Sequence, residues 1–227
     1  MPDFIVPLLL SLKVAAWATL FASILGISLA FLLSRWRSPW SDVIDSVLTL
    51  PLVLPPTVIG YYLLVLLGRR GWLGQWLDQW GVHLVFTWQG AVIAASIVSF
   101  PMVLKSARAA FQDVSPQMED AARVLGLTTP AIFFRVSLPL ASRGIVAGIL
   151  LAFARALGEF GATLMIAGSI PGQTQTLSIA IYEAVQAGND NLAASLVGVV
   201  SITCVVVLWS ASRLAPGKSR MNAGARP

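Results

Sequence analysis

The stretch "PLLLSLKVAAWATLFASILGISLAFLLS", residues 7–34, carries a single charged residue, Lys13. A membrane crossing takes about 20 apolar residues, so this stretch is long enough to span a bilayer. It exceeds the apolar part of a cleaved signal, and no small-residue cleavage site follows it, so we expect it to stay in the protein. Because backbone groups in lipid must bond within the segment, it is expected to be a helix.

Four further apolar stretches follow in the chain. The chain is 57% hydrophobic and 11% charged with a mean hydropathy of +0.81, whereas soluble domains are about 25% charged. We therefore predict an all-α membrane protein of one domain, residues 7–212, followed by a basic tail, 213–227. The five predicted transmembrane helices cover about residues 7–34, 41–67, 88–111, 139–168 and 192–208.

The distribution of Lys and Arg predicts the orientation, since short cytoplasmic connections are enriched in these residues. One side receives Arg35, Arg37, Arg123, Arg135, Arg213, Lys218, Arg220 and Arg226. The other side receives Arg69 and Arg70, which argue against the assignment, and four tryptophans of the kind found at membrane interfaces, Trp72, Trp76, Trp80 and Trp88. We expect a multi-pass protein of the cytoplasmic membrane with its N-terminus outside and its C-terminus in the cytoplasm.

Several functions are disfavoured by what the chain contains. The net charge of +5 comes from scattered basic residues, so no nucleic-acid partner is predicted. Cys204 is the only cysteine and His83 the only histidine, which excludes an intrachain disulfide and a His-rich metal site. No metal or cofactor is expected. No nucleophile, base and orienting group cluster in the sequence, so a membrane enzyme is the least favoured class.

A polar segment separates the third and fourth predicted spans. Ser115 is a candidate N-cap for a helix that starts at Pro116, and Glu119 and Asp120 lie in its first turns, where the helix dipole favours anions. Gly126 can take a positive φ and end this helix. An apolar side is predicted from the spacing of Met118, Ala121, Ala122 and Leu125.

A second short helix is expected after this one. Thr129 and Pro130 repeat the pattern of a cap followed by proline, and Leu138 and Pro139 restart the chain toward the membrane. Helices this short depend on packing for their stability. Periodicity alone leaves two interpretations open, a helix lying on the membrane surface and a docking element for another protein.

The segment resembles the EAA loop of the permease subunits of ABC importers, in which EAA is followed by three residues, Gly, nine residues and a hydrophobic-x-LP ending. The residues in register are Asp120, Ala121, Ala122, Gly126, Val136, Leu138 and Pro139. Asp120 stands where the family has Glu, with Glu119 just before it. The resemblance implies that this segment forms coupling helices that dock on a cytoplasmic ATPase. No GxxxxGK[ST] phosphate loop occurs in the chain, so ATP hydrolysis is expected in that partner.

Two features inside predicted spans point to a pathway. Pro51, Pro55 and Pro56 interrupt the second span, and broken helix at membrane depth belongs against protein or a wet cavity. We favour a cavity-lining role over a kink that only shapes the bundle. Arg155 and Glu159, four residues apart in the fourth span, can pair on one face, and both a gate and a lock between helices remain open.

A stripe of small residues, Gly144, Gly148, Ala152 and Ala156, is interpreted as packing. The stretches "LPLVLPPTVIGYYLLVLLGRRGWLG", "GEFGAT" and "IPGQTQTLSIAIY" extend the resemblance to the molybdate permease subunits, with sulfate and tungstate permeases as near relatives. The resemblance implies a type I permease fold and a homodimer in the bilayer. It also implies two ATP-binding subunits inside, an oxyanion-binding protein outside, and alternating access at the dimer interface. The rivals are sulfate or tungstate import and, in another class, an ATP-independent channel or secondary transporter.

Overall fold

The computed structural model describes residues 4–36 and 38–214, which form helices joined by turns, with no strand among them. This confirms the all-α class. Arg37 and residues 215–227 of the predicted tail lie outside the described residues. In chain order the elements are α1 (Ile5–Arg35), α2 (Pro39–Thr49), η1 (Leu50–Leu52), α3 (Pro56–Leu67), α4 (Trp72–Asp78), α5 (Trp88–Gln112), α6 (Pro116–Val124), α7 (Thr129–Ile132), η2 (Phe133–Ser137), α8 (Leu138–Leu157), α9 (Gly161–Ala167), α10 (Leu177–Gln186) and α11 (Asp190–Leu214).

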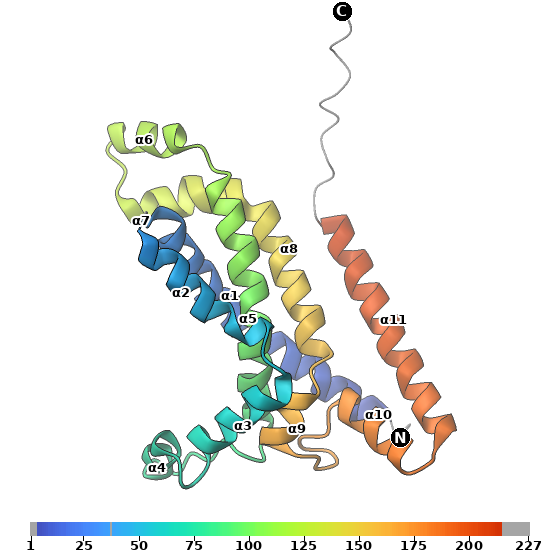
Figure 1. Ribbon diagram of the computed structural model, residues 1–227. Helices are drawn as coiled ribbons and strands as arrows, with labels where there is room; N and C mark the ends of the chain where they lie inside the picture. Colours follow the sequence, from blue (N-terminus) through green and yellow to red (C-terminus); the bar gives the residue numbers. More distant parts are fainter. Residues whose placement is uncertain (1–3, 37, 215–227) are drawn as a thin grey trace, which may run out of the picture.

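The centre of the molecule is a bundle of α1, α5 and α8 (Figure 1). The face between α1 and α5 is built from small side chains, and the following are fully buried: Ala15, Ala18, Ala91, Ala94 and Ala95. Small residues allow two helix backbones to approach closely, which is how membrane helices gain dispersion contacts in a solvent as apolar as themselves.

The small-residue stripe on α8 packs against α5. A Cβ atom added to Gly144 would lie 2.6 Å from the Cβ of Ala110, and one added to Gly148 would lie 2.5 Å from the Cβ of Ser106. Neither distance leaves room for a side chain. The stripe is therefore a packing seam.

Four helical stretches in the described residues are long and apolar enough to cross a membrane: residues 5–35, 88–112, 129–157 and 190–210. A fifth crossing results if α2 and α3 count as one bent span, since they meet at an angle of 101°. The predicted second span, 41–67, is thus two helices rather than one. The predicted fourth span, 139–168, is also two helices, because α8 ends at Leu157 and α9 begins at Gly161.

The bundle has two distinct ends (Figure 1). The α6 end carries α6 and α7, and the opposite α4 end carries α3, α4, α9 and α10. α11 packs mainly on α10, and only 11% of its apolar window is buried, against 61% for α5. Most of α11 is therefore available to lipid or to another chain.

Candidate functional site

Helix α6 is fastened to the end of the bundle through Glu119, which is 5% exposed. The Glu119 carboxylate accepts hydrogen bonds from Arg35 Nε at 3.0 Å, from Arg35 Nη2, and from Ser137 Oγ at 2.6 Å. Arg35 is the last residue of α1, and Ser137 ends η2. One carboxylate therefore joins α6, α1 and the start of α8.

Arg35 is itself held in place by neighbours at the end of the bundle. Its Nη1 donates to the Phe111 carbonyl at 3.3 Å and to Ser34 Oγ at 3.1 Å, and its guanidinium lies 5.0 Å from the centre of the Phe31 ring. Sequence analysis had used Arg35 only to orient the chain. Its partner Glu119 lies 84 residues away, beyond the reach of any local pattern.

Asp120 points away from this anchor. It is exposed and forms an ion pair at 2.6 Å with Arg123, three residues along the same helix. Ala121 is exposed, whereas Ala122 is 7% exposed and packs inward with Glu119. The two adjacent carboxylates thus have different environments, one inside the protein and one on its surface.

The predicted apolar side of α6 lies mostly on the surface, because only Ala122 of its four residues is buried. The face that packs is set by Glu119 and Ala122, which are three residues apart. The other apolar residues are left on the surface, with Met118 at 57%, Val124 at 88% and Leu125 at 79% exposed. Together with Ala121 they form what we call the α6 outer surface.

The end of α6 follows the prediction. Gly126 has φ +82°, its N–H donates to the Arg123 carbonyl at 2.9 Å, and the N–H of Leu127 donates to the Ala122 carbonyl at 3.1 Å. These bonds satisfy the last carbonyls of the helix in the way that a glycine terminus allows.

The predicted side-chain caps are wrong. Ser115 occupies the N-cap position, but its hydroxyl bonds to the Gln117 side chain rather than to the helix backbone. α7 begins at Thr129 itself, so that the cap position falls on Thr128, and no side chain caps it.

Leu138 and Pro139 are the first residues of α8, but no non-helical segment precedes them, so they do not restart the chain toward the membrane as predicted. The π-helical η2 joins α7 directly to α8. Proline has no N–H to donate to the preceding turn, and a wider helical register here keeps the chain helical across it.

The two interruptions predicted inside spans are brought together by the fold. Pro51 lies in η1, Pro55 caps α3 and Pro56 is its first residue, so the prolines occupy the 101° bend. A Cβ atom on Gly161, the first residue of α9, would lie 3.2 Å from the Cβ of Pro56, and one on Gly60 would lie 2.6 Å from the Cβ of Met165. We call this contact between α3 and α9 the broken-helix junction.

Glu159 lies at the corner between α8 and α9 and is 3% exposed. Its Oε2 lies 2.7 Å from Arg155 Nη1, as the spacing predicted, and its Oε1 accepts the backbone N–H of Ala162 at 2.9 Å. Because α8 ends at Leu157, the pair bridges a helix end rather than lying on one helix face. Both carboxylate oxygens have partners within the chain.

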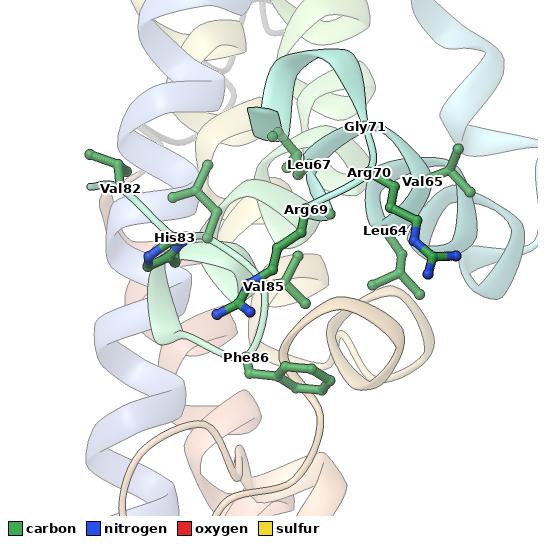
Figure 2. A pocket seen from close by; sticks show the side chains of 13 residues that line it. Leu64, Val65, Leu67, Arg69, Arg70, Gly71, Val82, His83, Val85 and Phe86 are labelled. Atoms are coloured by element: carbon green, nitrogen blue, oxygen red, sulfur yellow. The ribbon is translucent and has the colours of Figure 1, made fainter. Parts of the chain in front are cut away.

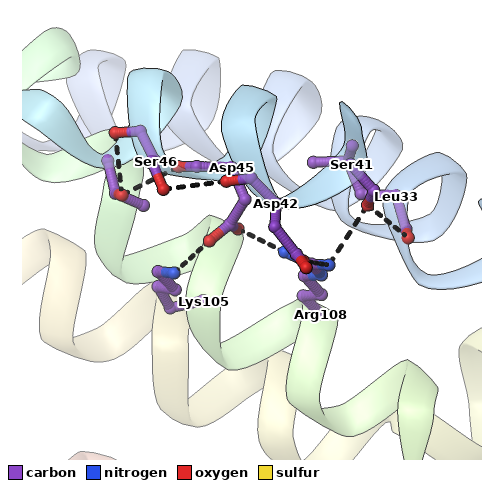
Figure 3. Close-up of polar contacts among 8 residues, drawn as sticks. Leu33, Ser41, Asp42, Asp45, Ser46, Lys105 and Arg108 are labelled. Carbon is purple, nitrogen blue, oxygen red and sulfur yellow. Dashed lines mark hydrogen bonds and ion pairs between the residues drawn. The ribbon is translucent and has the colours of Figure 1, made fainter. Parts of the chain in front are cut away.

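A third charged cluster, which sequence analysis missed, joins α2 to α5 (Figure 3). Asp45 is 6% exposed and pairs with Arg108 Nη1 at 2.8 Å and with Lys105 Nζ. Arg108 Nη2 also contacts Ser41 Oγ at 3.2 Å and Asp42 Oδ1 at 3.3 Å. The sequence pattern that could have indicated this cluster is a pair of acids, Asp42 and Asp45, and a pair of bases, Lys105 and Arg108, with three residues from one member of each pair to the other. The cluster holds α2 along α5 just before the bend.

None of these clusters resembles a metal centre. Across residues 4–36 and 38–214, no group of three or more His, Cys, Asp or Glu side chains is placed to hold a metal ion.

The long apolar helices of the fold define a multi-pass membrane protein, and the comparisons identify its class. Residues 22–220 match the family described as "Binding-protein-dependent transport system inner membrane component", and the chain belongs to this family. Among curated proteins it is similar to the Escherichia coli K12 "Molybdenum transport system permease protein ModB", at 44% identity over 95% of each chain.

Two further relatives extend this likeness. A "Putative molybdenum transport system permease protein" of Bacillus subtilis is 43% identical over 91% of this chain and 89% of that protein. The E. coli "Sulfate transport system permease protein CysT" is 32% identical over 94% of this chain and 77% of that protein.

Solved structures show the same fold at low identity. A chain of the MetNI methionine ABC transporter, in inward-facing conformations, gives a TM-score of 0.74 at 15% identity over 94% of both chains. A chain of a bacterial alginate ABC transporter, solved with an alginate-bound periplasmic protein, gives 0.78 at 16% identity over 96% of this chain and 82% of that one.

Proposed function

We propose that this chain is the permease subunit of an ATP-driven importer that carries molybdate across the inner membrane. The observation that carries the proposal is the 44% identity to a molybdenum permease over 95% of both chains. The anchored α6 segment lies within the matched region, so the part expected to meet the motor is included.

The proposed assembly pairs two copies of this chain with two ATP-binding subunits in the cytoplasm and an oxyanion-binding protein outside. The α6 outer surface supports a contact with the ATP-binding subunit. Met118, Val124 and Leu125 are exposed there, and exposed apolar side chains that lie together are typical of a surface that binds another protein. ATP hydrolysis then takes place in the partner subunit.

In this arrangement the α6 end faces the cytoplasm and the α4 end faces outward. α1 begins at the α4 end and α11 finishes at the α6 end (Figure 1), in keeping with an outer N-terminus and a cytoplasmic C-terminus. Arg35 lies at the cytoplasmic end of α1 in this orientation, as the charge rule for short loops requires.

Transport is proposed to work by alternating access at the interface of the two permease copies. When the ATP-binding subunits move α6, the hydrogen bonds of Glu119 to Arg35 and Ser137 pull on α1 and on the start of α8 together. The Glu119 end of this link is buried, and a closely packed interior transmits displacement because it is hard to compress.

The proposed gate lies at the broken-helix junction. The contact between α3 and α9 lies between two features, the prolines 51, 55 and 56 on one side and the Arg155–Glu159 pair on the other. A movement of α8 is therefore transmitted to the bend in the α2–α3 span. We assign Glu159 the role of holding the α8–α9 corner, since both its oxygens are bonded there, and Arg155 the role of the adjustable partner at 29% side-chain exposure.

Sulfate is the second candidate cargo, because a sulfate permease is 32% identical over 94% of this chain. The test is uptake in a strain that lacks its own molybdate system and expresses this chain together with an ATP-binding subunit and a molybdate-binding protein that assemble with it. We expect restored molybdate uptake. Restoration of sulfate uptake with no response to molybdate would reject the first choice, and gradient-driven transport in vesicles holding this chain alone would reject an ATP-driven mechanism.

A further inference from the structure

A cavity of about 770 Å³ opens at the α4 end, between the last turn of α3, the start of α4 and residues 82–86, which precede α5 (Figure 2). The side chains lining it are mostly apolar, with three exceptions that carry or accept a positive charge: Arg69, Arg70 and His83. None of these three has a part in the coupling segment or in the broken-helix junction.

The walls of this cavity are fixed by close backbone packing. A Cβ atom on Gly74 would lie 2.0 Å from the Gly68 carbonyl oxygen, so α4 can fold back against the end of α3 only with glycine at position 74. On the other wall, Phe86 takes φ +60°, an uncommon conformation for a residue other than glycine. Its N–H donates to the Ile166 carbonyl at 2.9 Å, which ties this wall to α9.

The arginines lack carboxylate partners. Among the residues that the structure describes, no Asp or Glu pairs with Arg69 or Arg70, and neither guanidinium donates a hydrogen bond. Asp78, the acid on α4, is 3.1 Å from His83 Nδ1. Figure 2 shows Arg69 extending across the cavity toward Val85 and Phe86, on the side where His83 lies, whereas Arg70 extends away from them.

Arg69 is exposed and lines the cavity, and none of the described carboxylates compensates its guanidinium charge, so the charge can attract anions that enter the cavity. Its planar array of N–H donors matches the oxygens of a tetrahedral oxyanion. The arginines also lie on the side of the membrane where Lys and Arg are ordinarily scarce, so orientation does not explain them.

We propose that this cavity is an entry site for a tetrahedral oxyanion, held chiefly by Arg69 with His83 beside it. The inference rests on the proposed function, since it names where the transported anion first contacts the permease. The wall that receives the anion is bonded to α9, which starts at the corner held by Glu159, so an occupied site adjoins the proposed gate. Arg70 adds only general attraction.

The phosphate of a phospholipid offers the same chemistry, and the cavity is much larger than one small anion, so the test separates the two sources. Binding of radiolabelled molybdate and of radiolabelled sulfate is measured on the full chain in nanodiscs of zwitterionic lipid and, in parallel, of lipid containing phosphatidylglycerol. The variants are Arg69→Gln, Arg69→Lys and, as the matched control, Arg70→Gln.

We expect saturable binding to the wild type in both lipids. Arg69→Gln should weaken it about tenfold or more, the usual effect of losing one charge-assisted hydrogen bond, with partial recovery in Arg69→Lys. Arg70→Gln should stay within about threefold of the wild type, as expected for a screened surface charge. In the assembled importer, Arg69→Gln should raise the KM for uptake and leave kcat nearly unchanged.

Equal affinities for wild type and Arg69→Gln, or no saturable binding, would overturn the inference. So would phosphatidylglycerol that co-purifies in an Arg69-dependent way and displaces the anion, because the occupant would then be a lipid headgroup. These results are separable from failure of the proposed function. Sulfate binding that depends on Arg69 can persist in a chain that fails to restore molybdate uptake, and restored uptake with Arg69-independent binding contradicts the entry site alone.

Discussion

Replacing Glu119 with Gln tests whether the anchor of α6 carries the coupling. The substitution keeps the shape of the side chain but removes the charge that faces Arg35, and it turns an –NH2 donor toward an Arg35 N–H where an oxygen accepted before. A hydrogen bond to a charged group contributes about 1.5–3 kcal/mol. The Arg35 side chain is 30% exposed, so water can recover part of the loss, which favours the lower half of this range.

Local opening of α6 should therefore become roughly 10- to 40-fold more frequent, since each 1.4 kcal/mol is a factor of ten. Hydrogen exchange of the full chain in nanodiscs measures this directly in peptides covering residues 116–127. Peptides from the middle of α5 should exchange at the wild-type rate, because that region packs independently of the anchor. In the reconstituted importer, transport per ATP hydrolysed should fall in parallel.

Asp120→Asn is the matched control, one residue away. It breaks an exposed ion pair with Arg123 that contributes at most about 0.5 kcal/mol, so exchange in α6 should change less than about threefold. Equal exchange rates in the wild type and Glu119→Gln would refute the reasoning. So would equal acceleration by the two substitutions, because the buried and the surface carboxylate would then contribute alike.

Three further substitutions test other parts of the molecule. Gly126→Ala should destabilise the end of α6 by about 1 kcal/mol. The cause is backbone strain at φ +82° alone, because a Cβ atom there meets no atom within 4 Å. Gly126→Asp should also uncouple ATP hydrolysis from uptake, which is measured as transport per ATP. Glu159→Gln should reduce uptake while the complex still assembles, as judged by co-purification of the ATPase, and loss of the assembled complex would favour a purely structural lock. Gly148→Val should lower the thermal stability of the detergent-solubilised chain by about 1–3 kcal/mol, since its Cβ would lie 2.5 Å from that of Ser106; an unchanged melting temperature would contradict the packing seam.

The long spans could be predicted closely from the sequence because each is a uniform apolar stretch with clear ends. The predicted residues 7–34 and 88–111 correspond to helices 5–35 and 88–112. The positions of the second and fourth spans could be predicted, but the division of each into two helices could not. Hydropathy reports how apolar a stretch is, and it is blind to the direction of the chain after Pro51 or Gly158.

The ion pairs were beyond prediction for a different reason. Helical periodicity relates residues three or four apart, and it found the pair of Arg155 with Glu159. Asp45 and Lys105 are 60 residues apart, and the pair is made only when α2 lies along α5. The same limit hid the partner of Glu119, although that residue lies in the segment predicted to be the coupling segment.

The structure shows that the departure of this chain from the EAA pattern leaves the anchor of α6 intact. Successive residues on a helix differ by about 100° in direction, so Glu119 and Asp120 cannot both face the bundle. The longer side chain is the one that turns inward, where it reaches Arg35 and Ser137, and the shorter one lies on the surface beside the exposed apolar residues of α6. An Asp at the family's Glu position therefore leaves the contacts with Arg35 and Ser137 unchanged, because Glu119, one residue earlier, makes them. The change shortens a surface carboxylate and leaves the anchor intact, so we expect it to affect the proposed contact with the ATP-binding subunit and not the fold.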